Sequence, residues 1–257
     1  MPVDIFTLAQ AQRVAVMLGR DPLALADGDP VPRGWHFAML AGLTPRRLLR
    51  SDGFPGLGVV MPQLDLPRLV LGGRSTIFHG DLVIGAGLRR ESSLASVEAK
   101  TGKAGPFAVA RIDHRLTSGA AEITETQTYI LAGPPAPAPK PAPITPPEGR
   151  ARVVTPDDLM LFQYSALGFN THRIHFDRDH ARSEGHPDLV VNGGLASLLA
   201  LEFLRDLGLR PASMSARHMA PLYVNRPLTL LVADARVLIL DDEGVLAAEL
   251  VMTFDDL

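Results

Sequence analysis

The residues best suited to chemistry lie in one short stretch of the second half of the chain. The run Phe169-Asn-Thr-His-Arg-Ile-His-Phe-Asp177 contains an amide, two imidazoles, a guanidinium and a carboxylate. Imidazole titrates near neutral pH and can pass protons. The run Asn192-Gly-Gly-Leu195 then opens an apolar stretch, and free backbone N–H groups at a helix start can hold a developing negative oxygen. Together the two runs predict an active site for acid/base chemistry on a carbonyl compound.

The histidines also allow a second interpretation, a metal site. Imidazole and carboxylate groups suit zinc or iron, and the candidate ligands are His172, His175, Asp177, His180 and His186. Nothing in a loop sequence makes these side chains converge on one point. We therefore expect no metal.

Two helices are expected to position the histidine loop. Leu159 to Ala166 precedes it, and a helix from about Gly194 to Leu207 follows it, with a buried stripe at helical spacing. Three strands should come next, through Met214–Tyr223, Leu228–Ile239 and Val245–Phe254. A central apolar helix followed by long antiparallel strands is typical of an α+β unit, in which a curled sheet wraps around one helix.

In the first half of the chain we also expect one helix and several strands. A helix is expected over Thr7 to Leu18, with Thr7 as its N-cap. The expected strands, some of them alternating apolar with polar residues, are Arg74–Phe78, Leu94–Ala99, Phe107–Leu116 and Ala121–Leu131. A proline-rich stretch over residues 134–148 separates the halves and should be a semi-rigid, exposed spacer. We therefore expect an N-terminal unit over residues 1–133 and a catalytic unit over residues 149–257.

Composition limits the classes of function. With 257 residues and 46% hydrophobic content, the chain can bury one large core or two small ones. A formal charge of −3 gives no global basic field for nucleic acid or anionic lipid. The absence of cysteine excludes disulfides and thiolate nucleophiles and fits a reducing compartment. No segment approaches the ~18 uninterrupted apolar residues of a membrane span, and we expect a cytoplasmic protein that binds neither nucleic acid nor membrane.

A family resemblance rests on several of these phrases. The run from Phe169 to Asp177 with Leu189-Val-Val-Asn-Gly-Gly-Leu195 resembles the catalytic motif of the MaoC-like hydratases and dehydratases. It is most similar to the branch of mesaconyl-CoA (3-methylfumaryl-CoA) and itaconyl-CoA hydratases. In the first half, Gly34-Trp-His-Phe37, Gly72-Gly-Arg-Ser-Thr-Ile-Phe78 and Glu98-Ala-Lys-Thr-Gly-Lys-Ala-Gly-Pro106 resemble that branch's partner domain. The resemblance implies a double hot-dog fold, two antiparallel sheets each wrapped around a central helix, and an acyl-CoA substrate.

The family motif, Asp-x-Asn-Pro-x-His, also assigns roles. Its His falls on His175 as the base, and the position of its Asp is taken by Asn170, which can orient a water but has no useful basicity. The glycine whose amide faces the thioester oxygen falls on Gly193, and Asn192 replaces the histidine that commonly precedes it. His172 is either a second proton donor or a packed turn residue. The pair Gly193-Gly194 either forms the anion-binding helix start, which the positive end of the helix dipole favours, or serves only as a tight entry to the helix.

Charged side chains are the candidates for binding the rest of the substrate. Arg173 is either an exposed loop cation or the bidentate partner of a free substrate carboxylate. Arg74, Lys100 and Lys103 are weaker candidates for the coenzyme A phosphates, and the two lysines could simply solubilise a turn. Coenzyme A enters only as part of the substrate, so no separate cofactor is expected.

The sequence as a whole predicts an enoyl-CoA hydratase or dehydratase acting on a short, branched, unsaturated dicarboxylyl-CoA. One alternative is a 3-hydroxyacyl-thioester dehydratase of fatty-acid metabolism. Another is a non-catalytic acyl-CoA binding protein, which the loss of the family Asp at Asn170 makes plausible. The oligomeric state stays open, with a homo-oligomer among the possibilities.

Overall fold

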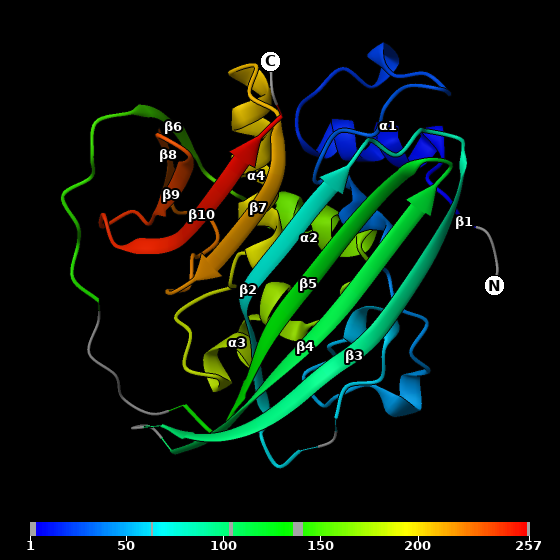
Figure 1. Ribbon diagram of the computed structural model, residues 1–257. Coiled ribbons are helices and arrows are strands. Elements are labelled where there is room, and N and C mark those ends of the chain that lie inside the picture. Colours follow the sequence, from blue (N-terminus) through cyan, green and yellow to red (C-terminus); the bar gives the residue numbers. More distant parts are fainter. Residues whose placement is uncertain (1–3, 63, 103–104, 136–140, 256–257) are drawn as a thin grey trace.

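An antiparallel sheet of ten strands dominates the structure, a computed structural model that describes residues 4–62, 64–102, 105–135 and 141–255. The strand order is β1-β3-β4-β5-β2-β7-β10-β9-β8-β6, and the sheet curves strongly (Figure 1). The strands are β1 (Asp4–Ile5), β2 (Arg68–His79), β3 (Gly87–Gly102), β4 (Gly105–Ser118), β5 (Ala121–Ala132), β6 (Arg150–Val154), β7 (Pro211–His218), β8 (Leu228–Ala233), β9 (Arg236–Leu240) and β10 (Leu246–Phe254).

The strands of the two halves are joined through β2 and β7. Residues 73–77 of β2 pair antiparallel with residues 213–217 of β7. The two sheets expected from the sequence therefore form one continuous sheet. Since β2 belongs to the first half and β7 to the second, the backbone hydrogen bonds between them hold the halves in a fixed register.

The longer helices α1, α2 and α4 lie behind the sheet in Figure 1, on one of its faces. The helices are α1 (Leu8–Met17), α2 (Asp158–Leu167), α3 (Arg178–Ser183) and α4 (Gly193–Asp206), with short 3₁₀ turns η1 (Pro22–Ala24), η2 (Trp35–Met39), η3 (Arg46–Leu48), η4 (Gly56–Gly58) and η5 (Arg173–His175). Thr7 and Gln10 cap α1 reciprocally, and the side chain of Asp157 accepts from Met160 N–H at the start of α2.

Only the second half has the expected central helix. Every residue of α4 from Gly194 to Leu204 is buried. In the first half, the described part of residues 19–67 contains short 3₁₀ turns in place of a long helix. This segment is rich in proline and glycine, and Gly34 has a left-handed backbone (φ 99°), so a continuous helix cannot pass through it.

The predicted strands Arg74–Phe78 and Leu94–Ala99 are longer in the structure, as parts of β2 and β3, and two others end or divide differently. The stretch Leu228–Ile239, expected as one strand, contains β8 and β9, because the chain reverses at Asp234 and Ala235. Asp234 adopts a left-handed conformation (φ 53°), which Asp tolerates better than most residues. The strand expected to reach Tyr223 ends at His218, so the residues that follow β7 are free to line a cavity.

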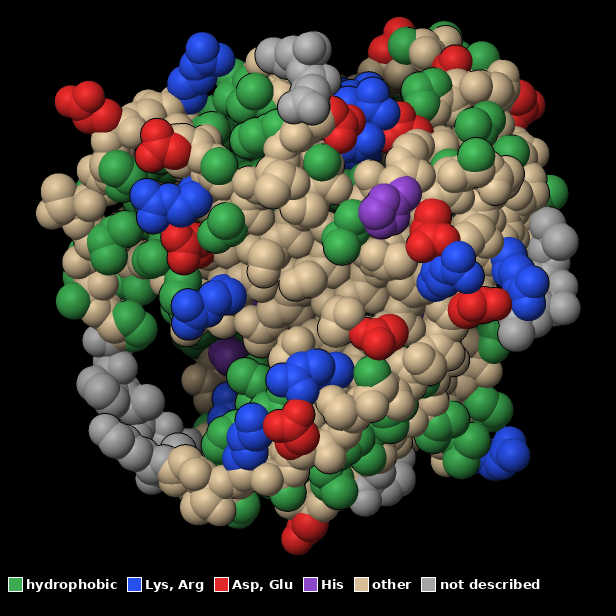
Figure 2. Space-filling model, viewed as in Figure 1, with side chains coloured by type: hydrophobic (Ala, Val, Ile, Leu, Met, Phe, Trp, Pro, Cys, Tyr) green, Lys and Arg blue, Asp and Glu red, His purple; other side chains and the backbone are tan. Residues whose placement is uncertain are grey.

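The distribution of charge on the surface agrees with the small net charge of the chain. On the face in Figure 2, cationic and acidic side chains are interspersed. No helix among the described residues is long and apolar enough to cross a membrane. Residues 136–140 of the proline-rich segment lie outside the described residues; residues 141–148 are mostly exposed, and Ile144 N–H donates to the carbonyl oxygen of Gly244 (3.1 Å).

Candidate active site

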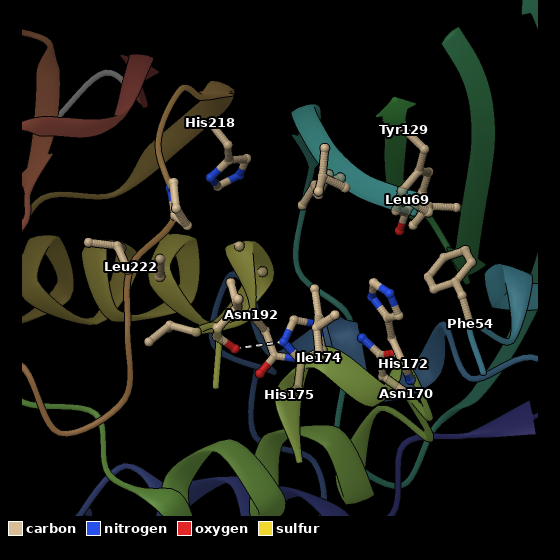
Figure 3. A pocket seen from close by; sticks show the side chains of 18 of the residues that line it. Phe54, Leu69, Tyr129, Asn170, His172, Ile174, His175, Asn192, His218 and Leu222 are labelled. Atoms are coloured by element: carbon tan, nitrogen blue, oxygen red, sulfur yellow. Dashed lines mark hydrogen bonds between the residues drawn. The ribbon is translucent and has the colours of Figure 1, made fainter. Parts of the chain in front are cut away.

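A cavity of about 270 Å³ lies between the β2–β5 side of the sheet and the histidine loop. Figure 3 shows His172, His175, Asn170 and Asn192 on one wall, with Leu69 and Tyr129 opposite. The lining combines residues of both halves, among them Phe54, Arg68, Leu69, Arg74, Gln127, Tyr129, Tyr164, Asn170, His172, His175, His186, Asn192, Gly193, Gly194 and His218. The cavity therefore exists only because the two halves pack together.

The histidine loop is fixed by a segment of the first half. Arg173 N–H donates to the carbonyl oxygen of Asp52 (2.9 Å), and Thr171 Oγ1 donates to that of Gly53 (2.6 Å). Gly53 has φ +81°, and a Cβ there would collide with the carbonyl oxygen of Thr171. The backbone of residues 52–53 thus lies directly against that of residues 171–173 in the other half. Only glycine fits at position 53, because any larger residue would clash there.

His175 has the geometry of a general base. Its Nδ1 lies 2.7 Å from the carbonyl oxygen of Val190. A carbonyl oxygen only accepts, so Nδ1 carries the proton and Nε2 keeps its lone pair. Burial lowers the pKa of His175 to about 4, because the charged imidazolium is poorly solvated there. At neutral pH the side chain is therefore a neutral imidazole on the cavity wall.

Asn170 lines the cavity next to this base. Its Oδ1 accepts a hydrogen bond from the backbone N–H of His172 (3.1 Å). With the carbonyl oxygen used in this way, the amide NH₂ is the group left for a ligand. Asn170 can therefore donate to the oxygen of a bound water and so orient it.

His172 lies deeper than His175. Its side chain is buried, its ring centroid is 5.3 Å from that of His175, and its Nε2 is 4.0 Å from a carboxylate oxygen of Asp52. Burial, and next the neighbouring His175, hold the pKa of His172 well below its usual range. His172 is therefore a neutral imidazole in the wall at neutral pH.

The start of α4 supplies the electropositive group of the site. Asn192 makes no side-chain cap to the helix, so the first N–H groups, including those of Gly193 and Gly194, have no partner within the helix. A Cβ on Gly193 would lie 3.1 Å from His218 Cε1, and a Cβ on Gly194 would collide with the hydroxyl of Tyr164. Glycine at both positions lets side chains from α2 and β7 approach the helix start, where the helix dipole favours a negative oxygen.

Comparisons with known proteins show the family of this chain. The family model for hydroxyacyl-thioester dehydratase type 2 matches residues 34–224. The chain is 36% identical to the mesaconyl-C(4)-CoA hydratase of Chloroflexus aurantiacus over 234 residues, 89% of this chain and 84% of the relative. The chain belongs to the hydroxyacyl-thioester dehydratase type 2 family. It is therefore a hydro-lyase of acyl thioesters, which confirms the prediction of an enzyme over that of a non-catalytic binding protein.

Solved structures support the hot-dog fold of this family member: Rv0216 from Mycobacterium tuberculosis, described as a double hot-dog fold, has a TM-score of 0.58 at 17% identity and covers 99% of this chain and 94% of its own. A MaoC-like dehydratase from Phytophthora capsici has a TM-score of 0.69 at 14% identity and covers 99% of this chain and 95% of its own. HtdX from Mycobacterium tuberculosis has a TM-score of 0.67 at 15% identity and covers 98% of both chains. The resemblance to the MaoC-like proteins predicted from the sequence is confirmed.

The structure brings most of the predicted site residues of this hydro-lyase together. His175, Asn170, Gly193, His172, Asn192 and Gly194 all line the cavity. Among the described residues, no group of three or more His, Cys, Asp or Glu side chains could hold a metal ion. The site thus offers a base, an amide and a helix start in one cavity.

The cations Arg173 and Lys100, predicted to bind the substrate, do not line the cavity. Arg173 is not among the lining residues: its guanidinium, 44% exposed, donates to Asp177 (3.0 and 2.7 Å). Lys100 is on β3, 3.1 Å from a carboxylate oxygen of Glu98 and outside the cavity. Lys103 lies outside the described residues. Of the two alternatives for Arg173, the structure favours the exposed loop cation, held by Asp177.

Arg74 lines the cavity from the interior of the sheet. It is 9% exposed, and its Nε lies 3.3 Å from Glu125 Oε1. Coenzyme A phosphates need solvent-facing cations, so this buried pair does not fit the role expected from the sequence. The burial of Glu125 follows from alternation in β5, which also turns Gln127 and Tyr129 inward.

Several lining residues were not predicted as site residues. They are Phe54, Arg68, Tyr129, Tyr164 and His218. The inward face of the alternating β5 sequence could have indicated Tyr129. Phe54 and Arg68 reach the cavity through the packing of the two halves, and Tyr164 and His218 reach it by packing against the start of α4; no local signal in the sequence marks these four.

Proposed function

We propose that the protein adds water reversibly to the carbon–carbon double bond of a short, branched dicarboxylyl-CoA, of which mesaconyl-C4-CoA is the leading candidate. The observation that carries the proposal is the meeting, in one cavity, of a neutral His175 whose Nε2 keeps its lone pair and the first amides of α4, which have no partner within the helix. The 36% identity to a mesaconyl-C(4)-CoA hydratase supports this substrate class.

The proposed mechanism uses only side chains and backbone of this chain. The thioester oxygen accepts from Gly193 N–H, which stabilises the negative charge that develops as water attacks the β-carbon; such donors are worth about 2.7–4 kcal/mol. Nε2 of His175 takes a proton from the water as its oxygen bonds to the β-carbon. The resulting imidazolium then returns a proton to the α-carbon, and the enolate collapses to the hydroxyacyl thioester. No cofactor takes part.

A substrate panel tests the proposed function. Purified protein is assayed with mesaconyl-C4-CoA, itaconyl-CoA, crotonyl-CoA and a long-chain 2-enoyl-CoA, and kcat/KM is compared. The proposal expects a dicarboxylyl-CoA to have the highest value. A preference for the long chain would instead support a fatty-acyl 3-hydroxyacyl-thioester dehydratase, the reading that the family description itself favours.

The position of His175 predicts an unusual pH profile. The base must be neutral, so kcat/KM for hydration should fall only as the pH drops through about 4, the lowered pKa of His175. An ordinary histidine would cause the same fall near pH ~6.5. Initial rates at each pH, with circular dichroism to confirm folding, check the prediction. A midpoint near 6.5 would contradict the buried, neutral base.

Asn170→Asp tests the replaced family residue. An Asp can still accept from His172 N–H, while its second oxygen takes the place of the amide NH₂. Activity should be retained, and the acid limb of the kcat/KM profile should move to higher pH, because a nearby carboxylate stabilises the imidazolium of His175. A loss of more than about 100-fold in kcat with unchanged KM would mean that the amide donor is essential.

The proposal includes a division of the chain into two units and a linker. We assign a first hot-dog unit to residues 1–133, a linker to residues 134–148 and the catalytic unit to residues 149–257. The pairing of β2 with β7 and the mixed lining of the cavity support a site built from both units.

A further inference from the structure

One end of the cavity contains buried polar atoms that lack partners. Arg68, at the start of β2, lines the cavity together with His172 and His186, and we call these three residues the Arg68 corner. Arg68 Nε, His172 Nε2 and His186 Nε2 are buried and have no hydrogen bond within the described residues; the same holds in the rest of the lining for Arg74 Nε, Asn192 Oδ1 and His218 Nε2. Buried polar groups are nearly always satisfied, so the three nitrogens of the corner are available to bind a polar group of a ligand.

The charge of Arg68 is poorly balanced by the protein. Glu184 is its nearest acid, but Nε and Oε2 are 4.0 Å apart, and both atoms lack a hydrogen bond. That separation is too long for a hydrogen bond. Burial, and next the nearby Asp52, raises the pKa of Glu184 to about 7. Burial therefore disfavours the charged form of Glu184, and at 4.0 Å this side chain balances the charge of Arg68 only weakly.

Arg74 Nε also lacks a hydrogen bond in the described part of the chain, but the charge of Arg74 is balanced by a carboxylate 3.3 Å away. Its partner Glu125 is fully buried and accepts from His36 Nε2 and Thr76 Oγ1, each at 2.9 Å. Burial opposes ionisation, but Arg74 and the hydrogen bond from His36 hold the pKa of Glu125 below its usual range, so the carboxylate stays ionised. A second carboxylate at Arg74 would leave an unbalanced negative charge in the interior, which is costly.

The Arg68 corner also lies next to the reacting groups. The ring of His172 is 5.3 Å from that of His175. In mesaconyl-C4-CoA the free carboxylate is bonded directly to the β-carbon, which takes up the water. A substrate held with its β-carbon at His175 would thus direct that carboxylate to a group adjoining the base. The imidazoles of the corner are neutral and can each donate one N–H to it.

We propose that Arg68, with His172 and His186, binds the free carboxylate of the dicarboxylyl-CoA substrate and so determines specificity. This inference rests on the proposed function. Arg68 takes the role that the sequence suggested for Arg173, whose guanidinium is held by Asp177 outside the cavity. Arg68 carries no proton in the reaction, so it acts on binding and orientation and leaves the acid/base steps to His175.

The test compares Arg68→Met with Arg173→Met on mesaconyl-C4-CoA and crotonyl-CoA. Arg68→Met keeps an unbranched apolar side chain but removes the charged fork. We expect it to lower kcat/KM for mesaconyl-C4-CoA about 10- to 100-fold more than for crotonyl-CoA, the size of one or two charge-assisted bonds. Arg173→Met should change both substrates by the same factor. Retained crotonyl-CoA turnover shows that the Arg68 variant is folded.

Other results would overturn the inference. Equal losses of kcat/KM on both substrates in Arg68→Met would make Arg68 a contact of the coenzyme A portion. A selective loss in Arg173→Met would restore that residue as the carboxylate partner. If the variant does not fold, Arg68→Lys replaces it, and an unchanged substrate ratio in Arg68→Lys and wild type would contradict a bidentate role. A wild type that hydrates crotonyl-CoA but no dicarboxylyl-CoA would refute the proposed substrate class itself.

Discussion

His175→Ala is expected to lower kcat for hydration by about 10²–10⁴-fold, the usual contribution of a general acid/base group. The substitution removes the only group in the proposed mechanism that takes the proton from water. It also removes the hydrogen bond from Nδ1 to Val190 that fixes the tautomer. KM should change much less than kcat, because the helix start and the Arg68 corner still hold the substrate.

The measurement is the initial rate of loss of the conjugated enoyl-thioester absorbance at saturating substrate. His79→Ala serves as a matched control, since His79 is an exposed histidine at the end of β2. The control should retain wild-type kcat. If His175→Ala also keeps near wild-type turnover, the base has been assigned to the wrong residue.

Gly194→Ala is expected to lower kcat by about 10²–10³-fold, similar to the loss of one oxyanion donor. Its Cβ would collide with the hydroxyl of Tyr164 and lie 3.0 Å from Arg74 Nη2. Tyr164 cannot move away easily, because it is buried and stacked on Phe37 with ring centroids 4.3 Å apart. The start of α4 must therefore shift, and the amide of Gly193 shifts with it.

A second substitution separates this cause from general damage. Tyr164→Phe in the Gly194→Ala background removes the colliding hydroxyl and should restore part of the lost kcat. Gly133→Ala is the control, since a Cβ there meets nothing within 4 Å. Full activity in Gly194→Ala would contradict the role given to the helix start, and the absence of any rescue by Tyr164→Phe would contradict the proposed collision.

Local sequence signals predicted the parts of the site that lie on one continuous segment. The loop from Asn170 to His175 and the Gly193-Gly194 helix start are near each other in sequence, and their residue types state their chemistry. The helix expected from Gly194 to Leu207 corresponds to α4 within one residue at each end. Strong apolar periodicity gives such elements clear boundaries.

The sequence did not predict which side chains of the loop point into the cavity. Arg173 lies between Asn170 and His175 in the motif, yet its side chain turns outward to Asp177, because the 3₁₀ turn over Arg173–His175 places neighbouring side chains on different sides. Arg68 is about 100 residues away in sequence and enters the site only through the long-range packing of β2. Similarly, the reversal at Asp234 was missed because its flanking alanines gave no turn signal.

The central claim, hydration of an enoyl-CoA, is tested most directly by following mesaconyl-C4-CoA with the purified wild-type protein in D₂O. The account predicts that the conjugated thioester absorbance disappears and that mass spectrometry finds a product heavier by one water. It also predicts one deuterium on the α-carbon, delivered by His175. Unchanged absorbance and mass with mesaconyl-C4-CoA and with every other enoyl-CoA offered would contradict the account.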